Sequence, residues 1–121
     1  MLRWCGSSKK GAAMRVPDDP YVLVWFSVTP IGTGSASVSR EVARALDAVE
    51  ATAVTYTTDA SGTLLEGRWS QCMEALKAAG QAVLEVAPRV SYICKIDLRS
   101  DKPNQTGADK LASLAAKRRR G

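Results

Sequence analysis

The stretch 21-YVLVWFSVTPIGTGSASVSREVARAL-46 decides the fold. Its first eight residues, Tyr21 to Val28, are almost all apolar and rich in valine and aromatic residues, which is typical of a strand with at least one buried face. Pro30, Gly32 and Gly34 follow and predict that the strand ends in a loop. The chain therefore enters a sheet here and leaves it through a glycine-rich connection.

The residues after this loop predict a helix over 38–51 with an apolar stripe on one side. Ser37 and Ser39 stand at its start, and a serine hydroxyl can accept a hydrogen bond from an unpaired first-turn N–H. A helix N-terminus carries roughly half a positive charge, so it can also hold a polar or anionic group. If the protein binds a small molecule, we expect the pocket to include this loop.

The rest of the body predicts a strand pair joined by a turn, then a second helix and a last strand, over 54–58, 63–67, 71–87 and 90–98. Ser70 is the expected N-cap of the second helix, and Pro88 ends it. The order is β-α-β-β-α-β. With right-handed crossovers, this order predicts the ferredoxin-like architecture of the α+β class, a four-stranded antiparallel sheet with two helices on one face.

The predicted domain covers residues 20–102. We expect residues 1–19 to form a disordered basic arm and 103–121 a polar, basic tail containing a short helix from about residue 108. The uncovered face of the sheet carries Leu23 and Trp25, which are too apolar for open water. We therefore expect that face to be buried by self-association.

The basic excess of the chain is confined to its two ends. Lys and Arg number 17 against 12 Asp and Glu, but the body over 18–109 holds eight of the basic residues and all 12 acidic ones. An acidic body favours a cationic ligand over a phosphate backbone. No apolar run approaches the ~18 residues of a membrane span. A cytoplasmic location is expected, with an organelle as the alternative if residues 1–17 act as a transit peptide.

The sequence contains no histidine, which excludes Ser-His-Asp and Cys-His catalytic pairs and histidine-ligated zinc. Cys5, Cys72 and Cys94 lack metal-ligand spacing, so buried or idle thiols in a reducing compartment are expected. We accordingly predict no catalytic residue, no metal site and no cofactor.

Four motifs in this order, FSVTPIGTG, SVSREVA, GTLLEG and KIDLRSDK, resemble the small thiamine-binding proteins, a family of conserved proteins first catalogued as uncharacterised. The resemblance covers about residues 22–102. It implies a ferredoxin-like fold, a homodimer or homotetramer built through the sheets, and binding of thiamine or its pyrimidine moiety without catalysis. The chain departs from the family pattern at Asp59 and Ser61 in the turn and at Gly80 and Gln81, where a His-Glu pair is usual.

Thiamine has a cationic thiazolium ring and an aminopyrimidine, so its pocket should offer a carboxylate, hydroxyl groups and an aromatic face. The resemblance and the acidic body together suggest a pocket near the sheet or subunit interface, with thiamine as ligand rather than as cofactor. The predicted ligand-binding residues are Trp25, Ser27, Ser37, Ser39, Asp59 and Glu66.

Each of these residues also has a purely structural interpretation. Ser37 and Ser39 could be helix caps, Trp25 could pack at a subunit interface, and Glu66 could pair with a basic residue on a neighbouring strand. Asp97 is expected to be a turn or ion-pair residue.

Two other function classes remain open. RNA-recognition domains share the β-α-β-β-α-β order, and both ends of the chain are basic, but TLLEG lacks the aromatic residues that such domains carry on the third strand. Nucleic acid is therefore not expected as a partner. A small enzyme without histidine would rely on Glu66, Asp59 or Lys95, but no spacing identifies an acid/base pair among them.

Overall fold

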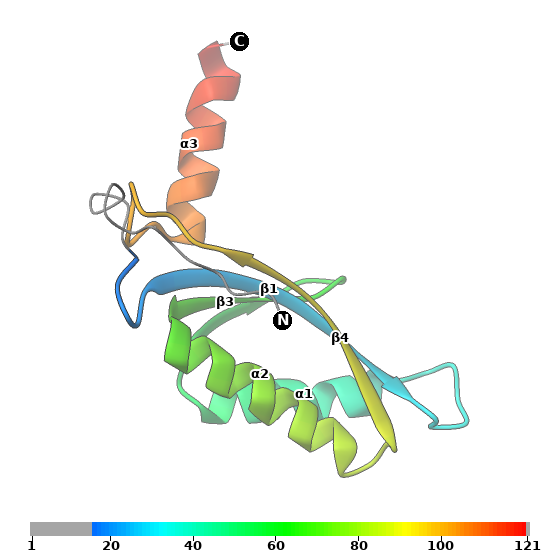
Figure 1. The fold of residues 1–121 in the computed structure, drawn as a ribbon. Helices are drawn as coiled ribbons and strands as arrows, with labels where there is room; N and C mark the ends of the chain where they lie inside the picture. The colour runs from blue at the N-terminus through cyan, green and yellow to red at the C-terminus, as the bar shows by residue number, and fades with distance from the viewer. Residues whose placement is uncertain (1–15, 121) are drawn as a thin grey trace, which may run out of the picture.

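The computed structural model describes residues 16–120; Cys5 and most of the predicted basic arm lie outside them. Four antiparallel strands form one sheet in the order β2-β3-β1-β4, and two helices cover one of its faces (Figure 1). This arrangement confirms the predicted ferredoxin-like fold. The elements are β1 (Tyr21–Ile31), α1 (Ser39–Ala51), β2 (Thr55–Thr58), β3 (Thr63–Arg68), α2 (Trp69–Leu84), β4 (Arg89–Asp97) and α3 (Gly107–Arg120).

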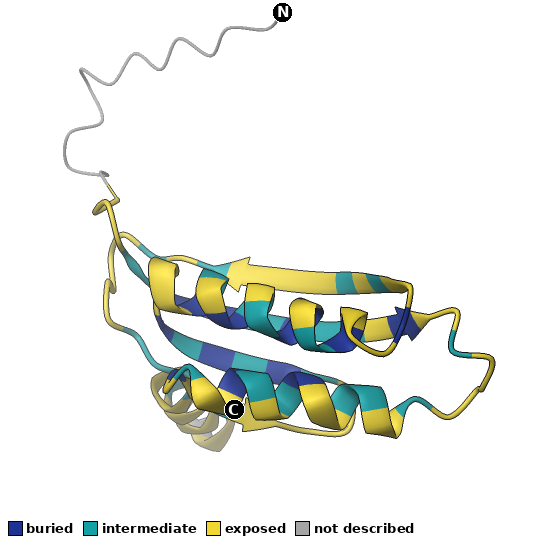
Figure 2. Ribbon diagram, turned by 90° about the horizontal axis from the view of Figure 1, so that it is seen from below, coloured by how far each residue is buried: buried dark blue, intermediate teal, exposed yellow. Residues whose placement is uncertain are grey.

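The core lies between the sheet and the helices α1 and α2 (Figure 2). Alternate residues of β1 point into it, as the sequence predicts, because side chains in a strand alternate between the two faces. Its fully buried members come from both strands and helices, and include Val22, Val24, Leu65, Val49, Cys72 and Val83. Burial raises the pKa of the Cys72 thiol to about 11, so this thiol stays protonated at neutral pH.

Strand β1 continues through Pro30 to Ile31, so the prediction that Pro30 ends the strand is wrong. The pairing with β3 stops at Phe26, whereas the pairing with β4 continues to Ile31. Beyond Phe26 one edge of β1 is therefore free of a partner strand in the described sheet. A proline, which has no N–H to donate, is tolerated at such an edge.

Helix α2 begins at Trp69 with Arg68 as its N-cap, so the predicted N-cap Ser70 is wrong. The backbone N–H of Arg68 donates to Oε1 of Gln71 at 3.0 Å. The N–H and hydroxyl of Ser70 both donate to the carboxylate of Asp19, at 2.8 and 2.7 Å. The segment before β1 thus supplies the helix cap that Ser70 was expected to provide.

Helix α1 begins at Ser39 after Val38, and no side-chain hydrogen bond caps it. The hydroxyls of Ser37 and Ser39 lie 3.5 Å from each other instead. Both serines are displaced by one residue from the N-cap position, so their interpretation as caps is wrong. The preceding loop turns through Gly32 and Gly34, whose positive φ angles of 88° and 76° favour glycine.

Helix α3 starts on the face of the sheet opposite α1 and α2 and projects away from the domain (Figure 1). The N–H of Gly107 donates to Oε1 of Glu66 at 2.6 Å, and Lys110 forms an ion pair with Asp97. Leu23, on the same face, is only 7% exposed. The tail of the chain thus provides part of the second layer that the apolar sheet face requires. Within residues 16–120, no helix has the length and apolar character needed to cross a membrane.

Candidate functional site

A crevice of about 560 Å³ opens on the face of the sheet that α1 and α2 leave bare, beside the start of α3. We call it the sheet-face pocket. Strands β1 to β4 form its floor, and the first turns of α3 form one wall. Its lining residues are Leu23, Trp25, Thr57, Asp59, Leu64, Glu66, Lys95, Asp97, Gly107, Ala108, Lys110 and Leu111.

Strand register brings the polar side chains of this pocket together. Leu23 pairs with Glu66 on one side and with Asp97 on the other, which places a carboxylate on each flank of β1. Two residues further along β1, Trp25 is flanked in the same way by Leu64 and Lys95. Because residues two apart in a strand share a face, both rows point into the pocket.

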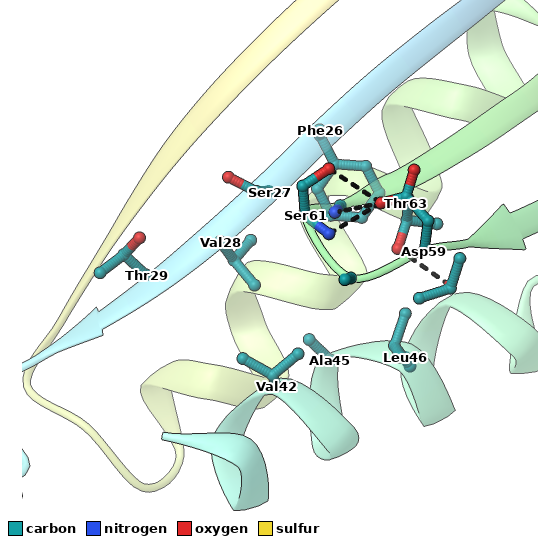
Figure 3. Close-up of a pocket in the computed structure, with 13 residues that line it drawn as sticks. Phe26, Ser27, Val28, Thr29, Val42, Ala45, Leu46, Asp59, Ser61 and Thr63 are labelled. Atoms are coloured by element: carbon teal, nitrogen blue, oxygen red, sulfur yellow. Dashed lines mark hydrogen bonds between the residues drawn. The ribbon is translucent and has the colours of Figure 1, made fainter. Parts of the chain in front are cut away.

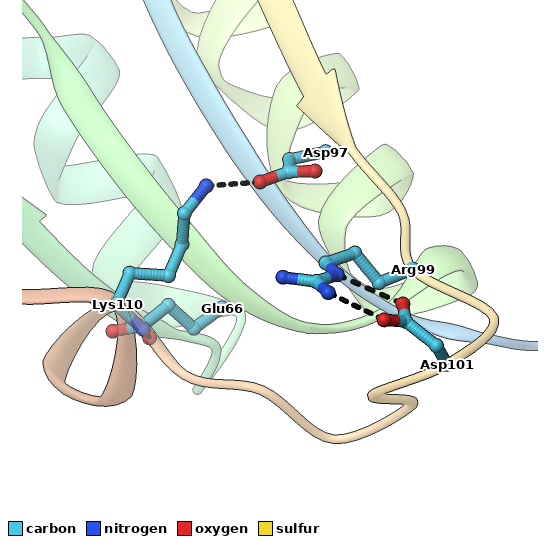
Figure 4. Close-up of polar contacts among 6 residues, drawn as sticks. Glu66, Asp97, Arg99, Asp101 and Lys110 are labelled. Atoms are coloured by element: carbon cyan, nitrogen blue, oxygen red, sulfur yellow. Dashed lines mark hydrogen bonds and ion pairs between the residues drawn. The ribbon is translucent and has the colours of Figure 1, made fainter. Parts of the chain in front are cut away.

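The two carboxylates that flank Leu23 are both engaged by α3 (Figure 4). Asp97 pairs with Lys110, which confirms its predicted role as an ion-pair residue. Glu66 accepts the backbone N–H of Gly107 through Oε1 and is not among the residues that form ion pairs in the described chain. A carboxylate has about four acceptor positions, so Glu66 retains capacity to accept a hydrogen bond from a ligand.

The pocket lining carries three carboxylates, on Asp59, Glu66 and Asp97, against the two ammonium groups of Lys95 and Lys110. This balance favours a cation. Within residues 16–120, no group of three or more His, Cys, Asp or Glu residues is placed to hold a metal ion.

Trp25 supplies the aromatic surface of the pocket. Its ring packs over the hairpin turn, where a Cβ atom added at Gly62 would lie only 2.5 Å from ring carbon Cζ2. The glycine therefore allows the indole to lie close against the turn, half-buried. An indole face exposed to a pocket attracts a cation placed over it.

A second crevice, of about 280 Å³, lies between β1, the β2–β3 turn and α1 (Figure 3). We call it the α1 crevice. Its floor is apolar, and hydroxyl groups and one carboxylate surround it. The lining residues are Phe26, Ser27, Val28, Thr29, Val42, Ala45, Leu46, Thr58, Asp59, Ala60, Ser61, Gly62 and Thr63.

Asp59 lines both crevices and also holds the turn together. Its Oδ1 accepts the N–H of Ser61 at 2.8 Å, the hydroxyl of Ser61 at 2.9 Å and the N–H of Gly62 at 3.0 Å. These bonds, led by the one from the Ser61 backbone, lower the pKa of Asp59. The carboxylate is thus ionised at neutral pH, with one oxygen committed to the turn.

The six predicted ligand-binding residues do not form one cluster. Trp25, Asp59 and Glu66 line the sheet-face pocket, and Ser27 lines the α1 crevice together with Asp59. The hydroxyl-bearing residues Ser37 and Ser39 are exposed and line neither crevice. The sequence thus predicted three residues that share one pocket and three that lie elsewhere.

Sequence reasoning missed the wall that α3 contributes to the sheet-face pocket. The signal for this helix lies at Thr106 and Asp109, which form a reciprocal cap. The N–H of Thr106 donates to Asp109 at 3.0 Å, and the N–H of Asp109 donates to the Thr106 hydroxyl at 3.1 Å. Recognising this spacing would have placed the helix start at Gly107, but the position of the helix against the sheet depends on the hydrogen bond from Gly107 to Glu66.

Comparison with known sequences gives a consistent result. The sequence profile described as "Thiamine-binding protein" matches residues 24–115. A UPF0045 protein of Mycobacterium bovis is 42% identical over 79 residues, which is 64% of this chain and 76% of that protein. A UPF0045 protein of Methanocaldococcus jannaschii is 39% identical over 83 residues, covering 69% of this chain and 82% of the relative.

Solved structures show the same fold. The crystal structure of the Methanocaldococcus jannaschii protein superposes with a TM-score of 0.73 at 35% identity, covering 79% of this chain and 97% of that one. A domain of unknown function from Bacillus cereus has a TM-score of 0.69 at 29% identity, covering 77% and 88% of the two chains. A Thermotoga maritima structure with a TM-score of 0.67 at 21% identity, covering 78% of this chain and 99% of that one, supports the fold alone.

Proposed function

Because this chain belongs to the thiamine-binding protein family, we propose that it binds thiamine or a related pyrimidine-containing molecule in the sheet-face pocket. The proposed role is non-catalytic, as a carrier, buffer or sensor of the ligand. The family's description supports binding, and the choice of ligand and pocket is supported by the side chains described above.

One observation carries the proposal: an indole ring and a carboxylate with spare acceptor capacity line the same acidic pocket. Trp25 offers an aromatic face to a thiazolium cation. Glu66 offers an acceptor to an exocyclic amine on a pyrimidine ring. The apolar side chains of Leu23, Leu64 and Leu111 would bury the uncharged parts of such a ligand.

The two crevices differ in size and chemistry, and the difference favours the sheet-face pocket. At about 560 Å³ the sheet-face pocket lies within the ~300–1,000 Å³ typical of small-molecule sites. The α1 crevice, at about 280 Å³, offers Asp59 as its one carboxylate and has no Trp in its lining.

We also propose that the bare face of the sheet is shared between copies of the chain, as a homodimer or homotetramer. Ile93, which precedes Lys95 by two positions on the same face of β4, is 64% exposed. Burying such side chains stabilises an association, since the hydrophobic effect scales with the apolar area removed from water. The pocket would then lie near a subunit interface.

Titration calorimetry of the full chain with thiamine tests the proposal. We expect saturable binding, and Glu66→Gln should weaken it by about 10- to 100-fold, because a hydrogen bond to a charged group contributes ~1.5–3 kcal/mol. Asp97→Asn should weaken it less, because Lys110 already neutralises Asp97. Absence of heat at millimolar thiamine would remove the proposal.

A matched control is Glu74→Gln, which removes an exposed carboxylate from α2, on the far side of the sheet. Its affinity should equal that of the unmodified chain. Because Glu66 also accepts the N–H of Gly107, thermal unfolding of the Glu66→Gln variant must show an intact fold before its affinity is interpreted. A larger effect from Asp97→Asn would show that the ligand uses the other carboxylate.

A further inference from the structure

The far end of helix α3 carries a cluster of positive charge. Lys117, Arg118 and Arg119 lie in its last turn, and their side chains are exposed. Lys117 follows Gly107, where the helix begins, by ten residues, so it lies about 15 Å further along the helix axis. Figure 1 shows that this end of α3 points away from the sheet. We call these three residues the basic tip.

The charge of the basic tip is not neutralised by the domain that carries it. Each of the three ion pairs found within residues 16–120 joins residues before position 111. All 12 acidic residues of the chain lie within 18–109, before the projecting part of the helix. Exposed charges separated by more than the Debye length, about 8 Å at physiological ionic strength, are largely screened from one another. The basic tip therefore presents its positive charge to a partner.

The arrangement of the three side chains indicates the shape of that partner. Consecutive residues of an α-helix point about 100° apart, so the basic tip spreads over about 200° around the helix axis. A helix that lies on a membrane has basic residues along one polar face instead. Before the tip, α3 has one basic residue, Lys110, which is paired with Asp97. The basic tip therefore fits a partner with negative charge on both sides of the helix.

Duplex DNA presents such a surface. Its major groove is about 12 Å wide, and an α-helix with its side chains is about 10–12 Å across. A phosphate chain borders the groove on each side, and the fork of N–H donors on an arginine matches a phosphate group. We propose that the basic tip binds duplex DNA by entering the major groove and contacting phosphates on both walls. Phosphate contacts carry no sequence information, so the binding is not sequence-specific.

This site is separate from those considered above. The argument against an RNA-recognition domain concerns the sheet, where β3 lacks the aromatic residues on which bases stack. Contact with phosphates requires positive charge and not an aromatic surface. The residues of the basic tip are also not among those that line the sheet-face pocket. An RNA duplex has a deep, narrow major groove, so DNA should be preferred.

Fluorescence anisotropy of a labelled DNA duplex, titrated with the full chain in the absence of thiamine, tests the inference. Three phosphate contacts should weaken binding by at least about 40-fold between about 50 and 200 mM salt. The variant Lys117→Gln, Arg118→Gln, Arg119→Gln should lose at least about tenfold in affinity at low salt, and most of the salt dependence. Glutamine is about as good a helix former as lysine or arginine, so α3 should persist, which circular dichroism verifies.

A matched control removes three positive charges from the body instead. Arg40, Lys77 and Arg89 are exposed and lie on α1, α2 and the start of β4. With all three changed to glutamine, the chain has the same net charge as the tip variant, so general attraction to DNA is reduced equally. The control should keep the salt dependence of the unmodified chain and lose less than about threefold in affinity.

Equal affinities of the two triple variants for the DNA duplex would overturn the inference, and so would an unmodified chain that does not bind it. An RNA duplex of the same sequence separates groove entry from attraction to phosphate. Equal binding of both duplexes would contradict entry into the groove. Binding only to vesicles that contain phosphatidylserine would overturn the inference and assign the basic tip to a membrane. Because thiamine is absent throughout, these results do not depend on whether thiamine binds.

Discussion

The hydroxyl of Tyr92 on β4 occupies the space that a Cβ atom would fill at residue 80 of α2. A Cβ built on Gly80 would lie 1.9 Å from the Tyr92 hydroxyl oxygen and 2.8 Å from ring carbon Cζ. The hydroxyl donates to the backbone carbonyl of Leu76, and burial raises the pKa of Tyr92. The departure from the family pattern at Gly80 thus has a structural reason. The Tyr92 side chain packs directly against the backbone of α2, and the Cβ atom of any residue other than glycine at position 80 would clash with it.

Gly80→Ala should therefore destabilise the protein, although alanine is the better helix former by about 1 kcal/mol. Overpacking a buried site typically costs ~1–3 kcal/mol, because the surrounding side chains must leave their rotamers. We expect a net loss of about 1–2 kcal/mol in the free energy of unfolding, measured by urea denaturation.

The double variant Gly80→Ala, Tyr92→Phe provides the control. Removing the hydroxyl relieves the shortest contact but leaves Cζ at 2.8 Å, so the recovery should be partial. Tyr92→Phe alone should cost about 1 kcal/mol, the usual net value of a hydrogen bond. Strict additivity of the two single variants would show that these residues do not compete for one space.

A second prediction concerns Asp19 and the pH dependence of stability. The pKa of Asp19 is lowered, first by the hydrogen bond from the Ser70 backbone and then by the one from its hydroxyl. A carboxyl whose pKa falls on folding stabilises the folded state above its unfolded pKa of about 3.9. This stabilisation is lost as the pH falls through the lowered pKa that Asp19 has in the folded state.

Asp19→Asn should therefore lower the melting temperature near neutral pH, and the difference from the unmodified chain should shrink as the pH falls below about 4. Asp18→Asn, at the neighbouring exposed position, is the control and should show no such trend. A melting difference that stays constant with pH would mean that the charge of Asp19 has no part in holding α2.

The order of elements was predictable because each strand and helix of the body has its own hydrophobic period. The errors lie at boundaries that depend on distant residues. The local sequence predicts Ser70 as an N-cap, but the carboxylate of Asp19, 51 residues away in the chain, accepts the hydrogen bonds at the start of this helix. The local sequence predicts that Pro30 ends the strand. The strand can contain this proline because β3 is shorter than β1 and does not pair with it beyond Phe26.

The candidate site was predictable where it depends on one face of one strand and not where it depends on the tail. Trp25 lies on the apolar, uncovered face of β1, and simple alternation places it there. The wall formed by Gly107 and Leu111 depends on the tail folding back onto Glu66. A contact across that much chain leaves no periodic pattern in the sequence.

A third prediction concerns Gly62, the residue through which the hairpin turn contacts Trp25 in the pocket. A Cβ at this position would lie 2.5 Å from the Trp25 ring and 2.6 Å from the carbonyl oxygen of Phe26. Since the backbone oxygen cannot move far, Gly62→Ala should displace the indole and cost about 1–3 kcal/mol of stability. The displaced ring should also weaken ligand binding.

The measurement is tryptophan fluorescence together with urea denaturation, with Ala60→Ser at an exposed position of the same turn as the control. Trp4 and Trp69 also emit, so the spectra of Gly62→Ala should be compared in a background that carries both Trp4→Phe and Trp69→Phe. Unchanged emission from Trp25, with unchanged stability, would contradict the close packing of the ring on the turn.

The last prediction concerns Lys95 and the charge of the ligand. It lies in the sheet-face pocket beside Trp25 and repels a bound cation. Lys95→Gln removes one positive charge, so the affinity for thiamine should rise by about 2- to 5-fold at low salt, a gain of ~0.5–1 kcal/mol. Screening should reduce this gain at high salt, where the Debye length is only a few ångströms. Calorimetry at two salt concentrations measures both effects.

The same variant distinguishes thiamine from its phosphate. A phosphate group would be attracted to Lys95, so Lys95→Gln should weaken the binding of thiamine phosphate while it strengthens the binding of thiamine. Lys77→Gln, on α2 and outside the pocket lining, should change neither affinity. If both ligands bind more weakly to Lys95→Gln and the fold is intact, then Lys95 contacts a part that the two ligands share, and the cation does not lie over Trp25 as proposed.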